Sequence, residues 1–184
     1  MSFFQRLFGS NSNSSSQYPL IAEKSVMNKK SHGTSKSPVQ QNLRWNCDNN
    51  TADRICSFNR HKAEASGYFW KSSSFLKTIN DSDDLPIQFY DSVTGALLFQ
   101  APIGRSMKEF IQESKSHGWP SFRDQEVVWD RTRCLKNGEC VSIDGTHLGH
   151  NLPDRSGNRY CINLVCIAGR KKNENETETK TEKD

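Results

Sequence analysis

The sequence predicts a mainly β domain with unstructured ends. Two stretches of the chain hold pairs of short β-rich runs joined by turn signals. A single segment has the apolar spacing and the capping residues of a helix. A third stretch, near the C-terminal end, is an apolar, β-branched run that predicts a buried strand. Hydrophobic residues make up only 33% of the 184 residues, so part of the chain is expected to stay outside the packed core.

The first hairpin is predicted over residues 84–92 (DLPIQFYDS) and 95–102 (GALLFQAP). A Thr-Gly turn signal separates these two β-rich runs. The helix follows at residues 106–117 (SMKEFIQESKSH), where Ser106 and Glu109 fit a capping box and the apolar residues share one face.

The second hairpin is predicted over residues 126–134 (EVVWDRTRC) and 139–144 (ECVSID). Asn137 and Gly138 between them are a strong signal for a two-residue turn. The run 159–168 (RYCINLVCIA) is apolar and β-branched, so we expect one continuous buried strand there.

Composition divides the chain into three parts. Residues 1–43 are rich in Ser, Asn and Lys and are expected to be disordered, like the charged tail 170–184. One domain is expected between them, at residues 44–169. No apolar run approaches the roughly 18 residues of a membrane span, and the N-terminal stretch does not fit a secretion signal. We therefore expect a cytoplasmic protein; an organelle, mitochondrion or plastid, remains the alternative because no acid precedes Glu23.

The distribution of charge argues against nucleic-acid binding. The net charge is +4, but residues 1–46 hold six Lys or Arg against one acid. Residues 170–184 hold five charges of each sign, which leaves 14 basic and 15 acidic residues in 47–169. A domain that binds phosphates along a groove is expected to carry the positive charge itself.

The stretch 146–163 (THLGHNLPDRSGNRYCIN) concentrates chemically active side chains. A buried, inert cysteine is the common alternative for a thiol such as that of Cys161. However, a nearby arginine favours the thiolate, and His147 and His150 are available as proton donors. A metal site is the less favoured reading, since zinc usually takes tight C-x-x-C pairs and the sequence contains none.

Three motifs resemble the B-type methionine-R-sulfoxide reductases. They are HGWPSF (117–122), HLGH (147–150) and NRYCIN (158–163), which occur in the family's order and intervals, and the segment 89–99 (FYDSVTGALLF) is similar as well. The resemblance covers residues 60–169. It implies the β-tent fold of two small antiparallel sheets with one or two short helices.

The resemblance also implies the role of each site residue. Cys161 would be the nucleophile, while His147 and His150 would bind water and protonate the sulfoxide oxygen. Asn163 would hold this polar network in place, and Arg159 would favour the thiolate. The indole of Trp119 would face the methyl group of the substrate.

The implied reaction is the reduction of methionine-R-sulfoxide to methionine. The thiolate attacks the sulfoxide sulfur, methionine leaves, and the cysteine becomes a sulfenic acid. A second thiol condenses with it, and a thioredoxin-like protein reduces the resulting disulfide. The substrate would be free methionine-R-sulfoxide or oxidised methionine in proteins, and we expect the enzyme to be a monomer.

The sequence departs from the family at the structural zinc site. Where many members have two C-x-x-C pairs, this chain has Asp91 and Thr94, then Val141 and Asp144. Cys140 is one position away and does not restore a tetrahedral set. We therefore expect a zinc-free branch, without a metal or another cofactor.

The resolving cysteine is the second departure. Several zinc-free members carry it immediately before G-W-P-S-F, where this chain has His117. A two-residue turn would place Cys134 and Cys140 on opposite faces, and a continuous strand would carry Cys166 away from the nucleophile. We therefore expect Cys56 to resolve, through an upstream segment that folds over the site. Cys134 and Cys140 are the next candidates, and direct attack by thioredoxin is the remaining one.

A different class of function stays open. The chain could be a non-catalytic β-tent binding module that kept the shape and lost turnover. The complete set of Cys161, both histidines, Arg159 and Asn163 argues against this alternative, and the missing resolving cysteine argues weakly for it.

Overall fold

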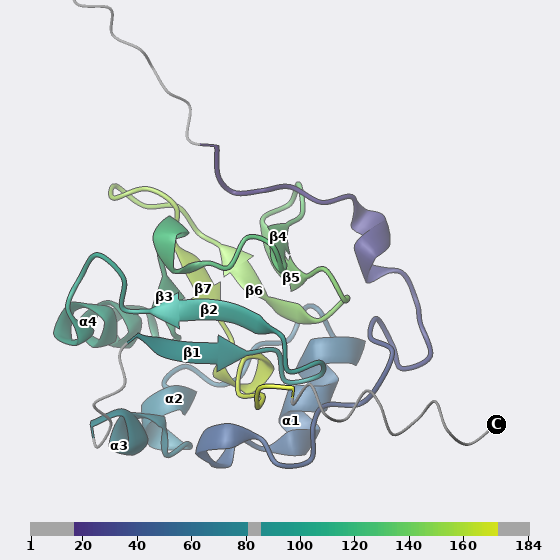
Figure 1. Ribbon diagram of the computed structural model, residues 1–184, viewed down its shortest axis with the longest axis horizontal. Coiled ribbons are helices and arrows are strands. Elements are labelled where there is room, and N and C mark those ends of the chain that lie inside the picture. Colours follow the sequence, from purple (N-terminus) through teal and green to yellow (C-terminus); the bar gives the residue numbers. More distant parts are fainter. Residues whose placement is uncertain (1–16, 81–85, 173–184) are drawn as a thin grey trace, which may run out of the picture.

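The computed structural model describes residues 17–80 and 86–172, and it confirms the mainly β fold class. Two antiparallel sheets make up the domain (Figure 1). One contains two strands, and the other contains five strands in the order β3-β7-β6-β5-β4. The strands are β1 (Ile87–Tyr90), β2 (Leu97–Ala101), β3 (Ser121–Phe122), β4 (Thr132–Cys134), β5 (Glu139–Ser142), β6 (His147–Asn151) and β7 (Tyr160–Ile162).

The helices are short, and the predicted one is the longest of those described. It is α4 (Met107–His117), and Ser106 and Glu109 form the expected capping box at its start. Gly118 ends the helix in the left-handed conformation that glycine adopts readily. The other helical elements are α1 (Asn49–Asp53), α2 (Tyr68–Lys71), α3 (Phe75–Asn80), η1 (Lys24–Met27), η2 (Arg44–Asn46), η3 (Arg54–Phe58), η4 (Asp124–Glu126) and η5 (Leu164–Cys166).

The aromatic core joins the two sheets. In Figure 1 the β1–β2 hairpin lies between the five-stranded sheet and helices α2 and α3. Phe89 on β1 packs edge-on against Phe122 of β3, with ring centroids 5.1 Å apart, and also contacts Phe75 of α3 at 5.8 Å. All three rings are fully buried. The first predicted hairpin is therefore confirmed and forms the centre of the core.

The second hairpin forms as expected, but its register is different. A two-residue turn would pair Cys134 with Val141, whereas β4 and β5 pair Cys134 with Cys140. The connection contains one residue more than a two-residue turn. The amide of Leu135 donates to the carbonyl of Glu139, and Gly138 closes the turn with a φ of 88°. The expectation that the two cysteines face opposite sides was therefore wrong. Their sulfur atoms lie 3.4 Å apart.

The predicted strand over residues 159–168 is interrupted. Strand β7 ends at Ile162, and the chain turns into η5 because a buried carboxylate, that of Glu64, accepts bonds from the amides of Leu164 and Val165 at 2.9 Å each. Cys166 therefore does not extend away along a strand, as we expected. Its thiol contacts that of Cys56.

The boundary expected at residue 43 was wrong for the described residues 17–43. The chain at residues 20–22 bonds to the exposed edge of β4 through Cys134. Lys30 donates to two backbone carbonyls at 2.7 Å, while Val39 and Leu43 belong to the core. Side-chain and edge-strand hydrogen bonds order this segment. Such bonds produce no periodic pattern of apolar residues, so the sequence did not reveal them. Residues 1–16 and 173–184 lie outside the described residues.

Among the residues described, none of the helices has both the length and the apolar character needed to cross a bilayer.

Candidate active site

Strand pairing places the nucleophile candidate and its partners on one face of the large sheet. Across the sheet, Ser121 of β3 pairs with Cys161 of β7, which pairs with His150 of β6, and His150 pairs with Glu139 of β5. Side chains of directly paired residues share a face. The four side chains therefore form a row across the sheet, in which Cys161 lies between Ser121 and His150.

Two members of this row, Cys161 and His150, line a cavity of about 360 Å³. Five of the predicted residues line it together: Cys161, His147, His150, Asn163 and Trp119. The remaining wall comes from Gly149, Leu152 and the segment 60–63. The lining thus combines apolar side chains, those of Trp119 and Leu152, with polar ones, those of His147, His150 and Asn163.

Cys161 is partly exposed, whereas the other five cysteines of the chain are buried. Burial raises the pKa of its thiol, and the hydrogen bond and positive charge of Arg159 only partly offset this effect. The carboxylate of Glu64 raises the pKa further. Our expectation that Arg159 favours the thiolate was right in direction, but burial dominates. In the free site Cys161 is mainly a thiol near neutral pH.

Arg159 lies behind the cavity rather than in its lining. Its side chain is buried, donates to the hydroxyl of Ser121 at 3.3 Å and lies 3.6 Å from the carboxylate of Asp154. These contacts fix the guanidinium beside the Cys161 thiol. Its geometry suits an indirect, electrostatic effect on that thiol.

His147 is held by a carboxylate that the sequence did not point to. Its Nδ1 lies 2.8 Å from Oε1 of Glu139, and Arg60 donates to both oxygens of the same carboxylate at 2.8 and 2.5 Å. Burial raises the pKa of Glu139, but the bonds from His147 and Arg60 outweigh it and lower that pKa to about 2. The carboxylate is therefore ionised and accepts the Nδ1 proton, which leaves Nε2 as the ring atom available to a ligand.

His150 completes the pair of histidines. Its ring centroid lies 5.8 Å from that of His147. Burial, followed by the neighbouring charge of His147, lowers its pKa. Near neutral pH it is therefore a neutral imidazole, which can share a proton with a ligand oxygen through either ring nitrogen.

Glu64 connects the two remaining site residues and was also missed in the sequence. Its amide donates to Oδ1 of Asn163 at 3.1 Å, and its carbonyl accepts from the indole nitrogen of Trp119 at 3.1 Å. Asn163 in turn donates to the carbonyl of Leu148 at 3.0 Å. Burial raises the pKa of the Glu64 carboxyl to about 7, against the effect of two backbone hydrogen bonds. A lone acid between alanines gives no sequence signal for this role.

Cys56 is not brought to the cavity. It lies in η3, is fully buried, and its thiol is hydrogen-bonded with that of Cys166. The upstream segment reaches the cavity through residues 60–63 instead. Cys134 and Cys140 lie one position out of step with the row of Cys161 and His150, so their side chains point to the opposite face of the sheet.

The residues at the resembled family's zinc positions do not suit zinc. Asp91, fully buried, accepts from the hydroxyl of Thr146 at 2.9 Å and from the amide of Val93 at 2.8 Å. Neither Val141 nor Thr94 supplies the sulfur or nitrogen that zinc prefers. Hydrogen bonds of Asp91 join the two turns directly.

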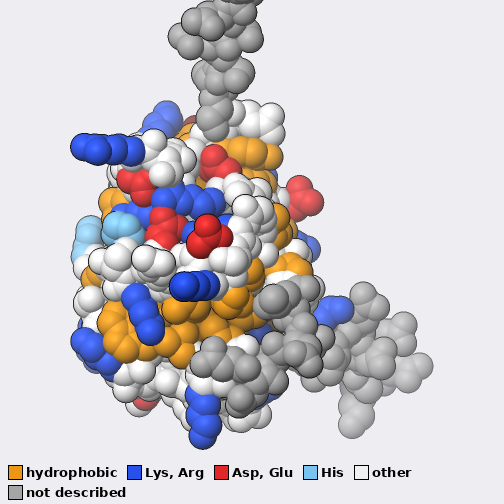
Figure 2. Space-filling view, turned by 90° about the vertical axis from the view of Figure 1, so that its left-hand side faces the viewer, with side chains coloured by type: hydrophobic (Ala, Val, Ile, Leu, Met, Phe, Trp, Pro, Cys, Tyr) orange, Lys and Arg blue, Asp and Glu red, His pale blue; other side chains and the backbone are white. Residues whose placement is uncertain are grey.

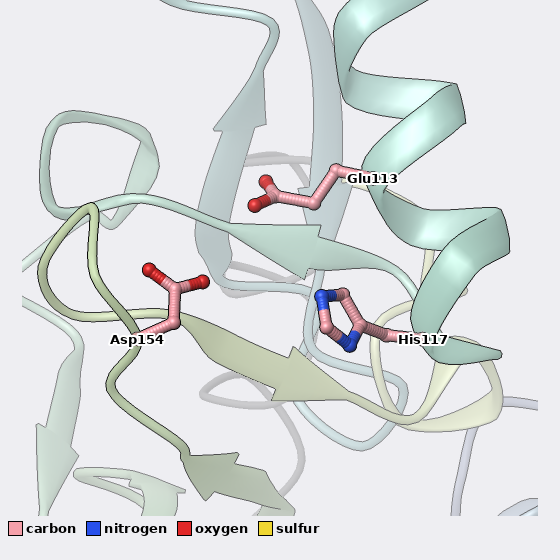
Figure 3. A group of neighbouring side chains, drawn as sticks. All are labelled: Glu113, His117 and Asp154. Atoms are coloured by element: carbon pink, nitrogen blue, oxygen red, sulfur yellow. The ribbon is translucent and has the colours of Figure 1, made fainter.

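A second group of possible metal ligands consists of Glu113 and His117 on α4 and Asp154 beyond β6 (Figure 3). Their ligand atoms lie within 4.8 Å of one another. Both carboxylates already pair with Arg123, which lies 2.9 Å from Asp154, and Arg105 also pairs with Glu113. Figure 2 shows acidic and basic side chains next to one another on this side of the molecule. The group is an ion-pair network rather than an open metal site.

No model of a known protein family matches the chain, and a comparison with curated proteins also finds no match. Function is therefore inferred from the geometry of the cavity and from the resemblance of three short motifs.

Proposed function

We propose that the protein is a methionine-R-sulfoxide reductase in which Cys161 is the nucleophile. The observation that carries the proposal is the convergence of Cys161, His147, His150, Asn163 and Trp119 on one cavity of about 360 Å³. The size suits a methionine side chain, and Cys161 is the one cysteine in its lining.

Substrate binding follows from the two sides of the cavity. The methyl group of the sulfoxide lies against the indole of Trp119, because a methyl that becomes partly cationic is attracted to an aromatic face by about 1 kcal/mol. The sulfoxide oxygen then faces His147 and His150. Chirality at sulfur places the Cys161 thiol behind the sulfur atom for one epimer alone.

The oxygen-transfer step balances within this site. The proton that leaves the Cys161 thiol reaches the sulfoxide oxygen through the histidine pair, since the free site holds a thiol and a neutral His150. The sulfur of Cys161 attacks the activated sulfoxide, the oxygen is transferred, and methionine leaves. The thiol and the sulfoxide thereby become a sulfenic acid and a thioether.

Regeneration uses thiols from another molecule. The sulfenic acid condenses with an external thiol, releases water and forms a mixed disulfide, and a second thiol then releases the Cys161 thiol and an external disulfide. The positions of the other five cysteines, all buried, support this route over an internal resolving thiol. A thioredoxin-like dithiol protein supplies both thiols in one molecule.

The test is turnover of the purified protein on the separate R and S epimers with dithiothreitol as reductant. We expect reduction of the R epimer alone, and no turnover by Cys161→Ser, whose hydroxyl is a far weaker nucleophile near neutral pH. A folded wild-type protein that reduces neither epimer would contradict the proposal and favour a non-catalytic binding module.

A further inference from the structure

The rim of the cavity carries more positive charge than the proposed chemistry requires. The segment 60–63, which covers the site, contributes Arg60, His61 and Lys62 to the lining. His61 and Lys62 are exposed to solvent. In contrast, the lining contains no Asp or Glu among the described residues.

The nearby acids do not neutralise this rim. Glu139 is occupied by Arg60 and His147, and Glu64 is buried against the amides of Leu164 and Val165. Within the part of the chain that the structure describes, Lys62 takes part in no salt bridge. The permanent positive charge of Lys62 therefore remains available to a ligand at the opening of the cavity.

The arrangement separates two kinds of recognition. Trp119 and Leu152 supply apolar surface for the methionine side chain, whereas the cations lie on the segment 60–63, in which His61 and Lys62 are exposed. When a methionine side chain enters the cavity, its neighbours along a peptide are left at the rim. A carboxylate there meets Lys62, while an ammonium or guanidinium meets charge of its own sign.

We propose that the site selects oxidised methionines that have Asp or Glu beside them in the sequence, and that Lys62 determines this preference. The inference rests on the proposed function, since it names the substrate class of the same site. The same preference disfavours free methionine sulfoxide as a substrate. Repulsion between its ammonium group and Lys62 offsets the attraction of its carboxylate.

The experiment uses three peptides of equal length that contain one methionine-R-sulfoxide flanked by Asp, Asn or Lys on both sides. We expect kcat/KM to fall in the order Asp, Asn, Lys, by roughly threefold per step at low ionic strength, because exposed charge pairs contribute weakly. The differences should shrink in about 0.5 M salt, where charges are screened over a few ångströms.

Two charge-reversal variants separate a local effect from a change of net charge. Lys62→Glu is expected to reverse the order of the peptides. Lys108→Glu makes the same change of net charge at an exposed position on α4, outside the cavity lining, and is expected to keep the wild-type order.

Peptide binding to Cys161→Ser, measured by calorimetry, separates this inference from the proposed function. If this variant binds the peptides in the expected order while the wild type turns none of them over, the reductase proposal fails and the ligand preference stands. Equal kcat/KM values and equal affinities for the three peptides would overturn the preference, and so would an unchanged order in Lys62→Glu.

Discussion

Glu139 fixes the orientation of the buried His147 ring through a hydrogen bond to Nδ1. Its carboxylate connects two side chains from distant parts of the chain, since Arg60 is 79 positions away in the sequence. A carboxylate bound to one ring nitrogen fixes the tautomer and the direction of the other nitrogen. Glu139 therefore positions the ring that would donate the proton in the proposed reaction, although it does not line the cavity.

Glu139→Gln is expected to lower kcat about tenfold and to change how stability depends on pH. The folded pKa of about 2 lies below the reference value of 4.5, so the ionised carboxylate stabilises the fold above about pH 5. That stabilisation, on the order of 2–3 kcal/mol, is lost as pH falls from about 5 towards 2. Urea unfolding at several pH values should show a flatter profile for Glu139→Gln. The exposed Asp130→Asn serves as the control, and a Glu139→Gln profile as steep as the wild type's would contradict this role.

The position of Cys56 bears on how the proposed reaction cycle would regenerate the Cys161 thiol. Its thiol is buried against Cys166 and has no place in the cavity lining. We expect Cys56→Ser to keep most of its thioredoxin-driven turnover, with dithiothreitol-driven turnover as the control. A selective loss of the thioredoxin-driven rate would show that η3 opens during the cycle and that Cys56 resolves after all.

Among the elements, strands β6 and β7 build the site by approaching each other closely at Gly149. This glycine lies between the two histidines, and a Cβ there would lie 2.0 Å from the carbonyl oxygen of Cys161. The H-L-G-H motif therefore combines two functional side chains with the one residue type that allows the strands to pair between them. The same spacing places His150 opposite Cys161.

Gly149→Ala is expected to cost about 3 kcal/mol in the free energy of unfolding and to abolish turnover, because β6 must move away from β7. Gly157→Ala is the matched control. It has a positive φ of 109° but meets nothing within 4 Å, so we expect a cost of about 1–2 kcal/mol with turnover retained. Thermal unfolding and the R-epimer assay measure both effects. Normal activity in Gly149→Ala would contradict the proposed packing.

Local patterns predict elements better than they predict register. The first hairpin and the capped helix α4 follow from alternation, turn residues and a capping box, all within a few positions. The register of β4 with β5 does not, because Asn137 and Gly138 are compatible with a turn of two or of three residues. The interruption of β7 is invisible for the same reason, since its cause is a carboxylate about 100 positions earlier.

For the whole molecule, the motifs predicted the floor of the site but not its surroundings. Cys161, His147, His150, Asn163 and Trp119 line one cavity, whereas Arg60 and Glu64 come from a segment without a recognisable pattern. Their contacts are long-range hydrogen bonds and ion pairs, which leave no periodicity in a sequence. Segment 17–43 escaped prediction in the same way, because backbone hydrogen bonds and a few widely spaced buried side chains, those of Met27, Val39 and Leu43, hold it.

The most direct test of the central claim is to trap the intermediate that oxygen transfer leaves on the protein. The reduced protein is mixed with one equivalent of methionine-R-sulfoxide or methionine-S-sulfoxide in the presence of dimedone, without a reductant, and is then digested and mapped by mass spectrometry. We predict one dimedone adduct, on Cys161, with the R epimer and none with the S epimer. An adduct on another cysteine, adducts of equal yield with both epimers, or unmodified Cys161 in folded protein would contradict the account.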